Sequence, residues 1–360
     1  MGLHSIRLRN FRTFSEFELE FVPDATTLLL SPNGTGKTSI LEAIFVMATG
    51  ASFRTGSSGD LIKTNTDKGS ANALAFHEQR RLEFDVAVSR GVRAVTKKIT
   101  VNKQKPHSLS ALYEAFPVTV FTPEGVDMVR RDPAGRRDFI THLAITLDPR
   151  VADSTDRFDR VVRQRNALLK SLGGEMPVGA QRDELAVWDA EFVSSGLDVV
   201  TAREAALTAV APIVGEYYRM LSDGHGEATL RYERSWEDQL ESALRAELRR
   251  DVQRGHCTIG PHRDDVSILL DGRDARRQAS QGEQRSLALA LLLGGDSLVR
   301  TEREITPLLM LDDVFSELDP IRSTRLLSLL PTGQTLVTAA APLPTDLLPA
   351  VVVDVTKVAS

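Results

Sequence analysis

The stretch Ser31-Pro-Asn-Gly-Thr-Gly-Lys-Thr38 lies between an apolar run, residues 26–30, and a segment from Ser39 onward whose apolar residues recur with helical spacing. A strand that ends in a glycine-containing turn and leads directly into a helix leaves backbone N–H groups unpaired at the helix start. These groups and the helix dipole favour an anion. Because Gly34 and Gly36 allow the backbone to curl around phosphate oxygens, the stretch predicts a phosphate-binding loop.

The side chains of this loop have predicted roles. Lys37 would bring a positive charge to the β- and γ-phosphates of a nucleotide, and Thr38 would offer a hydroxyl to Mg²⁺. The usual pattern, G-x-x-x-x-G-K-S/T, has glycine where this chain has Ser31, so the loop must accept a Cβ at its start. The alternative is a turn that precedes a lysine by coincidence. The residues predicted to bind the nucleotide are Ser31, Asn33, Gly34, Thr35, Gly36, Lys37, Thr38 and Ser39.

The composition allows a substantial core and does not advertise nucleic-acid binding. With 360 residues, 42% of them hydrophobic, the chain can form one large domain or two ordinary ones. The net charge of −5 means that any DNA-binding surface must be a local patch. No run reaches the roughly 18 apolar residues of a membrane span, and the start lacks the apolar core of a signal peptide, so we expect a cytoplasmic protein.

The cysteine content excludes a domain held together by intrachain disulfide bonds. The single cysteine, Cys257, rules out an intrachain disulfide framework and fits a reducing compartment. His256 and His262 lie nearby, but without a second cysteine an ordinary loop is favoured over a metal site.

The order of predicted elements indicates an α/β fold with one mixed sheet built from both ends of the chain. From Arg137 to Ser222 the pattern is helical, with an interruption expected near Pro212 and no sustained heptads of a long coiled coil. We expect a first ATPase segment at 1–136, a helical lobe at 137–225 and a second ATPase segment at 226–360. Strands are predicted at 3–9, 17–21, 26–30, 82–88, 98–101, 118–121, 228–232, 266–270, 307–311, 335–339 and 351–353, and helices at about 38–49, 236–253, 282–299 and 320–330.

Two carboxylates follow a buried strand. Pro307-Leu-Leu-Met-Leu-Asp-Asp313 reads as a Walker B strand, in which Asp312 would hold Mg²⁺ and Asp313 could orient or deprotonate the attacking water. With Lys37, these are the predicted catalytic residues, and Thr38 with Asp312 the predicted metal ligands. The alternative, a core strand with a polar end, loses weight once a phosphate loop is present.

A second anion-binding helix start follows from Ala279-Ser-Gln-Gly-Glu-Gln284, which opens a helix without supplying a lysine. Such an end is redundant for one chain binding one nucleotide, but it makes sense if it caps a nucleotide held by a partner chain. The predicted contacts to the partner's nucleotide are Ser280, Gly282, Gln284 and Asp319.

In their order, these segments resemble the signature, Walker B and D-loop of ABC-type ATPases, including the SMC and Rad50 relatives. More specifically, the chain is similar to the RecF family of bacterial recombination mediators, and the similarity covers nearly the whole chain. The supporting segments are Asn10-Phe-Arg12, Pro32–Thr38, Ser52-Phe-Arg54, Phe121-Thr-Pro-Glu124, Pro133 with Arg136-Arg137, Arg163-Gln-Arg-Asn-Ala-Leu-Leu169, Gly260-Pro-His-Arg-Asp-Asp265, Ser280–Arg285, Leu311–Val314 and Glu317-Leu-Asp319.

This resemblance implies an ABC-type head with a Rad50-like helical lobe and an ATP-dependent head-to-tail homodimer. ATP and Mg²⁺ would lie between Lys37, Thr38 and Asp312 of one chain and Ser280 and Gly282 of the other, with Arg54 near the nucleotide. The dimer would bind DNA, hydrolyse ATP slowly, and work with RecR and RecO to help load RecA at gaps.

Four departures from the ABC pattern make fast hydrolysis doubtful. They are Ser31 at the start of the loop, Asp313 in place of glutamate, Glu283 within the signature, and Thr338 where a switch histidine would stand.

For DNA, the candidate contacts are arginines without a base-reading motif, so we expect sequence-independent binding, with single/double-strand junctions among the possible sites. A solvated helix face is an equally weighted alternative, because acidic residues such as Asp156 and Asp159 dilute the basic helix. The candidates are Arg130, Arg131, Arg136, Arg137, Arg163 and Arg165.

Rival functions remain. A transporter-type ATPase subunit is disfavoured by the long helical insertion, and a DNA scaffold that binds ATP with negligible turnover would fit the same motifs. A GTPase is disfavoured because Asn102-Lys-Gln-Lys105 lacks the final acid of the base-reading tetrad.

Overall fold

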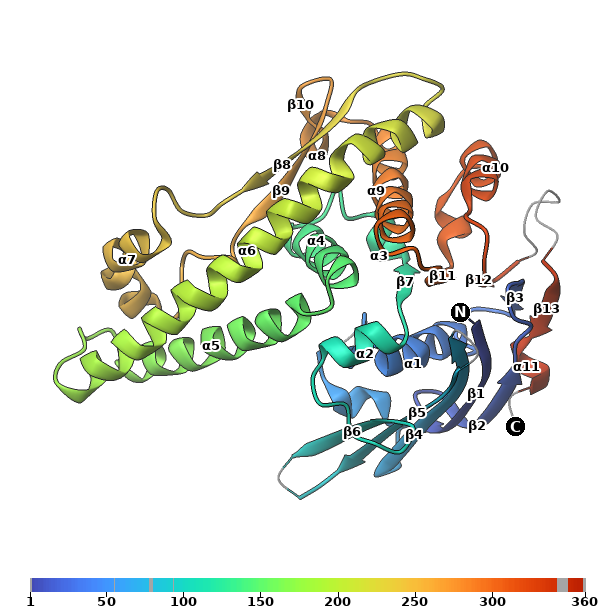
Figure 1. Cartoon of the computed structure of the whole chain (residues 1–360), viewed down its shortest axis with the longest axis horizontal. Coiled ribbons are helices and arrows are strands. Elements are labelled where there is room, and N and C mark those ends of the chain that lie inside the picture. Colours follow the sequence, from blue (N-terminus) through green and yellow to red (C-terminus); the bar gives the residue numbers. More distant parts are fainter. Residues whose placement is uncertain (1, 55, 78–79, 93, 342–348, 359–360) are drawn as a thin grey trace. The chain divides into compact units, whose positions relative to one another are not determined.

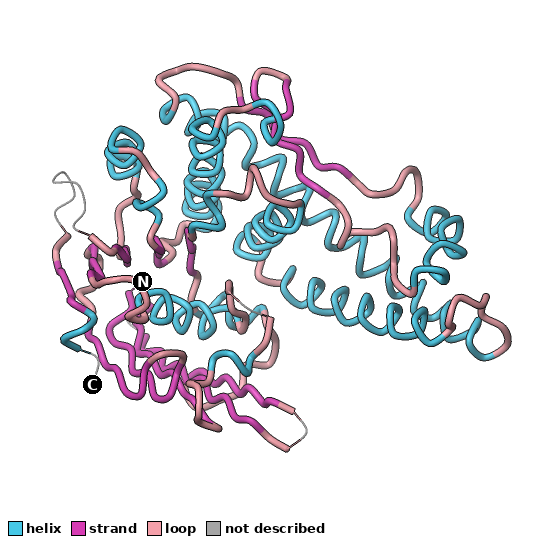
Figure 2. The backbone as a smooth tube through the Cα atoms, turned by 180° about the vertical axis from the view of Figure 1, so that it is seen from behind, coloured by secondary structure: helices cyan, strands magenta, loops and turns pink. Residues whose placement is uncertain are grey.

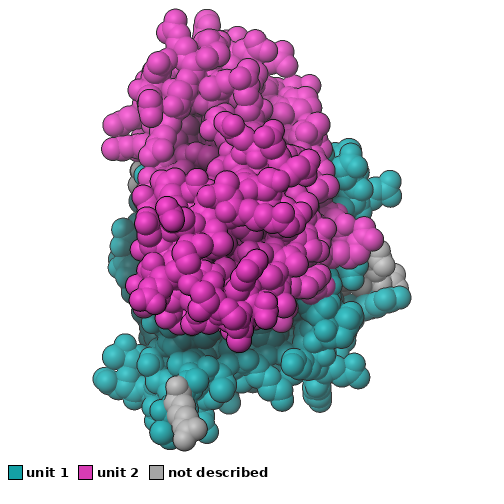
Figure 3. All heavy atoms as spheres, turned by 90° about the vertical axis from the view of Figure 1, so that its left-hand side faces the viewer, with its two compact units in different colours: residues 1–127, 288–360 teal, residues 128–287 magenta. Residues whose placement is uncertain are grey.

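The computed structural model describes residues 2–54, 56–77, 80–92, 94–341 and 349–358 (Figure 1). Contacts divide the chain into two compact units, coloured in Figure 3. Unit 1 consists of Met1–Asp127 and Ala288–Ser360, and unit 2 of Met128–Leu287. Unit 2 therefore includes residues 226–287, which the sequence division placed in the second ATPase segment; the functional division of the chain stays a prediction.

A parallel sheet in unit 1 joins the two ends of the chain, as the sequence predicted. Its order is β13-β3-β12-β11-β7, and every neighbouring pair is parallel. The strands are visible in magenta in Figure 2. Central β11 and β12 are buried along their whole length, which explains their continuous apolar runs. The bounds are β3 (Thr26–Leu30), β7 (Val118–Phe121), β11 (Leu308–Asp312), β12 (Thr335–Ala339) and β13 (Val351–Asp354).

An antiparallel sheet forms the other layer of unit 1, in the order β2-β1-β4-β5-β6. The sequence reading missed β4, because its inward side chains Ala71, Ala73 and Ala75 are small residues with low β propensity. It also gave one mixed sheet where the structure has separate parallel and antiparallel sheets. The bounds are β1 (Gly2–Phe11), β2 (Phe14–Glu20), β4 (Lys68–His77), β5 (Arg80–Arg90) and β6 (Val95–Val101).

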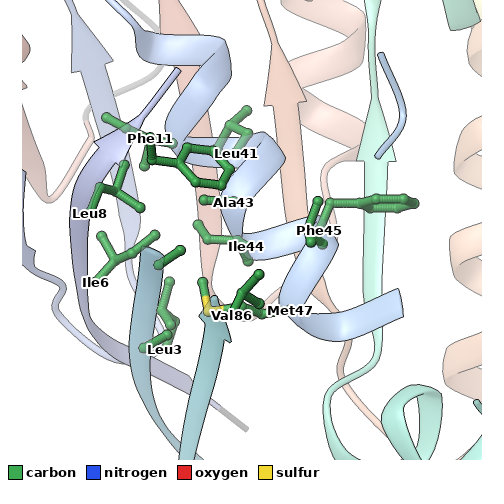
Figure 4. Packing of buried hydrophobic residues seen from close by; sticks show 14 of the residues in the cluster. Leu3, Ile6, Leu8, Phe11, Leu41, Ala43, Ile44, Phe45, Met47 and Val86 are labelled. Carbon is green, nitrogen blue, oxygen red and sulfur yellow. The ribbon is translucent and has the colours of Figure 1, made fainter. Parts of the chain in front are cut away.

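Helix α1 (Lys37–Thr49) contacts strands of both sheets. It is therefore buried on nearly all sides and lacks a polar face. Figure 4 shows Leu41 and Ile44 of α1 packed among Leu8 and Phe11 of β1 and Val86 of β5. This core holds α1 in place, and β3 is held in the parallel sheet. The loop that connects β3 to α1, residues 31–36, is therefore anchored at both of its ends.

The remaining elements of unit 1 are short, apart from α9, which begins in unit 2 and continues in unit 1. They are the 3₁₀ turns η1 (Ser58–Leu61) and η2 (Val314–Glu317), and helices α2 (Ser110–Ala115), α3 (Pro123–Val126), α9 (Gln281–Arg303), α10 (Pro320–Leu329) and α11 (Val355–Val358).

Unit 2 combines helices with a small antiparallel sheet in the order β10-β9-β8. The interruption predicted near Pro212 is wrong, because α6 runs unbroken from Ala180 to Leu221. Pro212 lies on the exposed side of α6, where water can satisfy the carbonyl that loses its partner, while buried Val210 and Val214 hold the helix in place. The bounds are α4 (Pro133–Leu147), α5 (Val151–Ser171), α6 (Ala180–Leu221), α7 (Leu240–Arg254), α8 (Ala275–Gln278), β8 (Ala228–Glu233), β9 (Asp265–Leu270) and β10 (Arg273–Asp274).

None of the helices in the described part of the chain is long and apolar enough to cross a membrane.

Candidate functional site

The loop between β3 and α1 has the conformation that its glycines predict. Gly36 caps the start of α1 with φ of 104°, and Gly34 has φ of 83°, so both occupy the left-handed region that favours glycine. Ser31 is buried at the start of the loop, and its hydroxyl lies 2.5 Å from the Thr35 hydroxyl. The loop therefore accepts a serine in place of the expected glycine, and the serine hydroxyl forms a hydrogen bond across the loop.

Lys37 is almost fully buried, and its ammonium group folds back along the loop. Nζ donates to the carbonyl oxygens of Ser31 at 2.5 Å and Pro32 at 3.0 Å. Burial lowers the pKa of Lys37, while the nearby carboxylates of Asp313 and Asp312 oppose that shift. The loop thus holds a desolvated cation, which would gain strongly from a phosphate.

Asp312, at the end of β11, joins the Walker B strand to the phosphate loop. Its Oδ1 accepts a hydrogen bond from Thr38 Oγ1 at 2.9 Å and another from Thr338 Oγ1 at 2.8 Å. Burial raises the pKa of Asp312, and the hydroxyls of Thr338 and Thr38 and the charge of Arg54 partly offset this rise. Two segments separated by 274 positions in the sequence therefore meet at one carboxylate.

Thr338 connects the two aspartates. Its hydroxyl donates to Asp312 and accepts the backbone N–H of Asp313 at 2.9 Å. Asp313 has φ of 48°, an uncommon value for a residue with a side chain. The residue that stands in place of the switch histidine thus fixes the backbone at the turn that carries Asp313.

These residues fit Mg²⁺. Thr38 and Asp312 offer a hydroxyl and a buried carboxylate, and such hard oxygen ligands are the ones that Mg²⁺ takes in nucleotide sites alongside phosphates and water. Burial raises the pKa of Asp312 more than the charge of Arg54 and the two threonine hydroxyls lower it, so a bound cation would stabilise this carboxylate. Among the described residues no cluster of three or more His, Cys, Asp or Glu side chains is placed to hold a metal without such a nucleotide.

A cavity of about 500 Å³ lies over the loop within unit 1. The predicted residues that line it are Asn33, Gly34, Gly36, Lys37, Thr38, Ser39, Arg54 and Asp313. The sequence reading missed its other walls, which are Arg12, Thr13, Asp60, Ile62 and Thr64. Arg12 and Thr13 come from the turn between β1 and β2, and only the similarity of Asn10-Phe-Arg12 to a known family marked that turn beforehand.

The segment predicted to contact a partner's nucleotide forms a helix start. The backbone N–H of Ser280 donates to Glu283 at 2.7 Å, and that of Glu283 to the Ser280 hydroxyl at 3.3 Å, which is a capping box. The Gln284 amide donates to the carbonyls of Ala275 and Arg276, so its hydrogens are already used inside unit 2. Asp319 caps α10 by accepting the Arg322 N–H at 2.9 Å. Their contact with a nucleotide stays a prediction.

Two of the arginines predicted to contact DNA are structural. Arg165 is fully buried and donates to Asp189 and Asp251, both at 2.7 Å. Arg136 is also buried and forms a fork with Asp265, with both N–O distances 2.9 Å. Because these guanidinium groups are enclosed and paired, we withdraw the DNA contact proposed for both.

The other four candidate arginines are more accessible. Arg130, Arg131 and Arg163 are exposed, and Arg137 is half-buried with one N–H donated to the Asp264 carbonyl at 2.8 Å. Burial lowers the pKa of Arg137.

The fold and the site define a class. A family model described as the RecF/RecN/SMC N-terminal domain matches residues 2–341. The solved Smc head bound to the C-winged helix domain of ScpA has a TM-score of 0.54 and 16% identity, over 95% of this chain and 90% of that one, and so shares the fold. The chain is thus an SMC-like ATPase head of the ABC type, and the residues that the structure describes contain no long coiled coil.

Matches to individual proteins identify the family within this class. The DNA replication and repair protein RecF of Frankia alni is 34% identical over 360 residues, covering 94% of this chain and 93% of that protein. Solved structures of the recombination mediator RecF with ATPrS and with ATP both have a TM-score of 0.82. Their identities are 25% and 26%, over 97% and 98% of this chain and 95% and 94% of theirs. The chain belongs to the RecF family.

Proposed function

We propose that this chain binds ATP and Mg²⁺ in the unit 1 cavity and hydrolyses ATP slowly, as a DNA-binding protein of replication and recombinational repair. The hydrogen bond between Thr38 and Asp312 carries the proposal, because it joins the phosphate loop to the carboxylate that such a site requires. A solved structure of RecF, a recombination mediator of the RecFOR pathway, is of its complex with ATP. The F. alni relative is named as a DNA replication and repair protein.

The residues divide the chemistry between them. Lys37 and the N–H groups of the loop would neutralise the phosphates, and Thr38 and Asp312 would hold the metal ion. Mg²⁺, when bound, supplies a Lewis acid that stabilises charge on the phosphate oxygens. Asp313, at the edge of the cavity, would accept a proton from the attacking water. Because this side chain is one methylene shorter than that of glutamate, we expect slow hydrolysis of ATP. We also expect DNA to stimulate this hydrolysis.

The capping box at Ser280 supports a sandwich homodimer. The first turn of α9 carries helix N–H groups next to an exposed serine, a suitable end to approach the nucleotide of a second chain. Gly282 and Asp319 would complete this contact, whereas the Gln284 amide is buried and already donates to Ala275 and Arg276, so we do not assign it a nucleotide contact. In that dimer Arg130, Arg131, Arg137 and Arg163 are the candidate contacts to DNA phosphates, and RecR and RecO would be the partners with which the dimer aids RecA loading.

Sedimentation with ATP or ADP plus Mg²⁺, with and without duplex DNA, tests this proposal. We expect a dimer with ATP only, and we expect Ser280→Arg to stay monomeric while its ATP affinity is unchanged. Ser171→Arg, at another exposed serine of unit 2, is the control and should dimerise normally.

A wild-type chain that binds ATP but remains monomeric on DNA would contradict the sandwich. A dimer that forms on DNA without measurable phosphate release would instead support an ATP-binding scaffold, an alternative that the short side chain of Asp313 favours.

A further inference from the structure

One acidic residue, Glu42, lies within the mostly apolar helix α1. Glu42 is fully buried, although α1 is packed between two sheets. Burying a carboxylate costs several kcal/mol unless it is paired and hydrogen-bonded, so its partners must account for its presence.

Two segments of the chain converge on this carboxylate. Arg12, from the turn between β1 and β2, donates through Nε at 2.7 Å and Nη2 at 2.5 Å. Ser52 donates its hydroxyl at 2.5 Å, and Arg54 its Nη1 at 3.4 Å. The Ser52 hydroxyl also accepts the backbone N–H of Arg54 at 3.0 Å. Glu42 is thus the shared partner of two arginines from separate loops.

Both arginines form part of the wall of the unit 1 cavity. The side chain of Arg12 is 17% exposed and that of Arg54 is 43% exposed, so each has one side toward Glu42 and another open to the cavity. Arg54 also lies close enough to Asp312 to act on it electrostatically. The cavity therefore has two cations in addition to Lys37.

The backbone at Arg12 is held in an unfavourable conformation. Its φ is 51°, and that of Asn10, near the end of β1, is 46°. The surrounding structure enforces this turn, since Arg12 N–H donates to Leu61 O and Lys63 N–H donates to Asn10 O, both at 2.9 Å. Such strain costs about 1–3 kcal/mol per residue and persists where a site requires a particular placement.

We propose that Glu42 is a positioning residue that holds Arg12 and Arg54 as one pair of cations directed at the polyphosphate of the bound nucleotide. A fixed guanidinium loses less side-chain entropy when it meets a phosphate, so the gain in affinity comes from preorganisation. The arginines lie between the carboxylate and the cavity and screen its negative charge. This inference rests on the proposed binding of ATP in that cavity.

The test is the affinity for ATP measured by calorimetry in EDTA without DNA, so that hydrolysis does not contribute. We expect Glu42→Gln to weaken ATP binding by at least about tenfold. In a chain that already carries Arg12→Gln and Arg54→Gln, the same substitution should have no further effect. Glu18→Gln is the matched control, because Glu18 pairs with Arg7 on the same hairpin but lies outside the cavity lining, and it should bind ATP normally.

If Glu42 were only structural, Glu42→Gln would lower the melting temperature and leave the ATP affinity of the folded protein unchanged. If Glu42 acted on ATP independently of the arginines, Glu42→Gln would weaken ATP binding as much in the Arg12→Gln, Arg54→Gln chain as in the wild type. Either result overturns the inference. If Glu42→Gln does not fold, Arg12→Lys decides, because lysine keeps the charge but cannot make the two-pronged contact; wild-type affinity in that variant also overturns it. A wild-type chain that binds no ATP even when Mg²⁺ replaces EDTA would instead refute the proposed function.

Discussion

At the scale of single residues, the aspartates of the site differ in how the fold treats their charge. Asp312 is buried, and its pKa is raised chiefly because burial disfavours the carboxylate. Asp319 lies near the surface, and its pKa is lowered chiefly by the backbone N–H of Arg322. The first charge therefore costs folding free energy without a cation, and the second contributes to stability.

Asp312→Asn is expected to raise the free energy of unfolding near neutral pH in the absence of Mg²⁺ and nucleotide. The folded state binds the Asp312 proton more tightly than the unfolded state, so stability falls as pH rises from about 3.8 through the raised pKa. Asparagine can still accept from Thr38 and Thr338 while carrying no charge. The gain over wild type, measured by urea unfolding across this range, should vanish as the pH approaches 3.8.

Asp319→Asn supplies the control of opposite sign. Its lowered pKa contributes stability above the unfolded value of 3.8, and this contribution is lost as the pH falls through the folded value. This variant should therefore be less stable than wild type near neutral pH. Equal responses of the two variants to pH would contradict the assignment.

At the scale of elements, the start of α1 depends on the turn between β1 and β2. That turn packs against the phosphate loop so closely that a Cβ on Gly36 would lie 2.5 Å from Phe14 Cζ and 2.6 Å from Thr13 Oγ1. The two segments are neighbours only through the stacking of the antiparallel sheet on α1. The loop conformation is consequently a property of this packing as well as of its own glycines.

Gly36→Ala is expected to cost about 3 kcal/mol of stability, because left-handed strain adds to overpacking against Phe14. Gly34→Ala is the matched control: its φ is also positive, but nothing lies within 4 Å of the added Cβ. It should cost about 1–2 kcal/mol, from the backbone term alone. Urea unfolding followed by circular dichroism measures both, and equal losses would show that the contact with the turn does not matter.

At the scale of the whole molecule, unit 2 has its own core and its own buried ion cluster. The Arg165 guanidinium contacts Asp189, Asp251 and the Cys257 sulfur, and lies over the Phe192 ring. Both tryptophans of the chain, Trp188 and Trp236, belong to this unit, so fluorescence reports on its folding.

Arg165→Ala is expected to destabilise unit 2 by about 3–5 kcal/mol, since it leaves two carboxylates without their cation. Arg163→Ala, at an exposed position on the same helix, should change stability by less than about 0.5 kcal/mol. The midpoint of urea unfolding followed by tryptophan fluorescence compares them. A variant Arg165→Ala with wild-type stability would contradict the structural role assigned to this arginine and restore it as a candidate for DNA contact.

The two arginines of helix α5 show where sequence reasoning ends. Arg163 and Arg165 look equivalent in a basic segment, and only packing shows that one is exposed and the other fully enclosed. Likewise, Pro212 predicts an interruption of α6 from its missing N–H, but the flanking buried valines override it. Local preferences cannot reveal which side of a helix the rest of the chain will cover.

The sequence by itself determined the α/β fold, the phosphate loop and the paired aspartates, because glycine conformations, apolar runs and strand-to-helix order are local in origin. Only the tertiary structure decided that Thr38 meets Asp312, that Thr338 links both aspartates, and that Glu42 gathers Arg12 and Arg54. Most of these contacts join different elements of the chain, up to 274 positions apart for Thr38 and Asp312. The contacts of Asp312 and Asp313 depend on the parallel pairing of β11 with β12 and of β12 with β3, and the contact of Arg12 with Glu42 depends on the packing of the antiparallel sheet against α1. No local pattern encodes either arrangement.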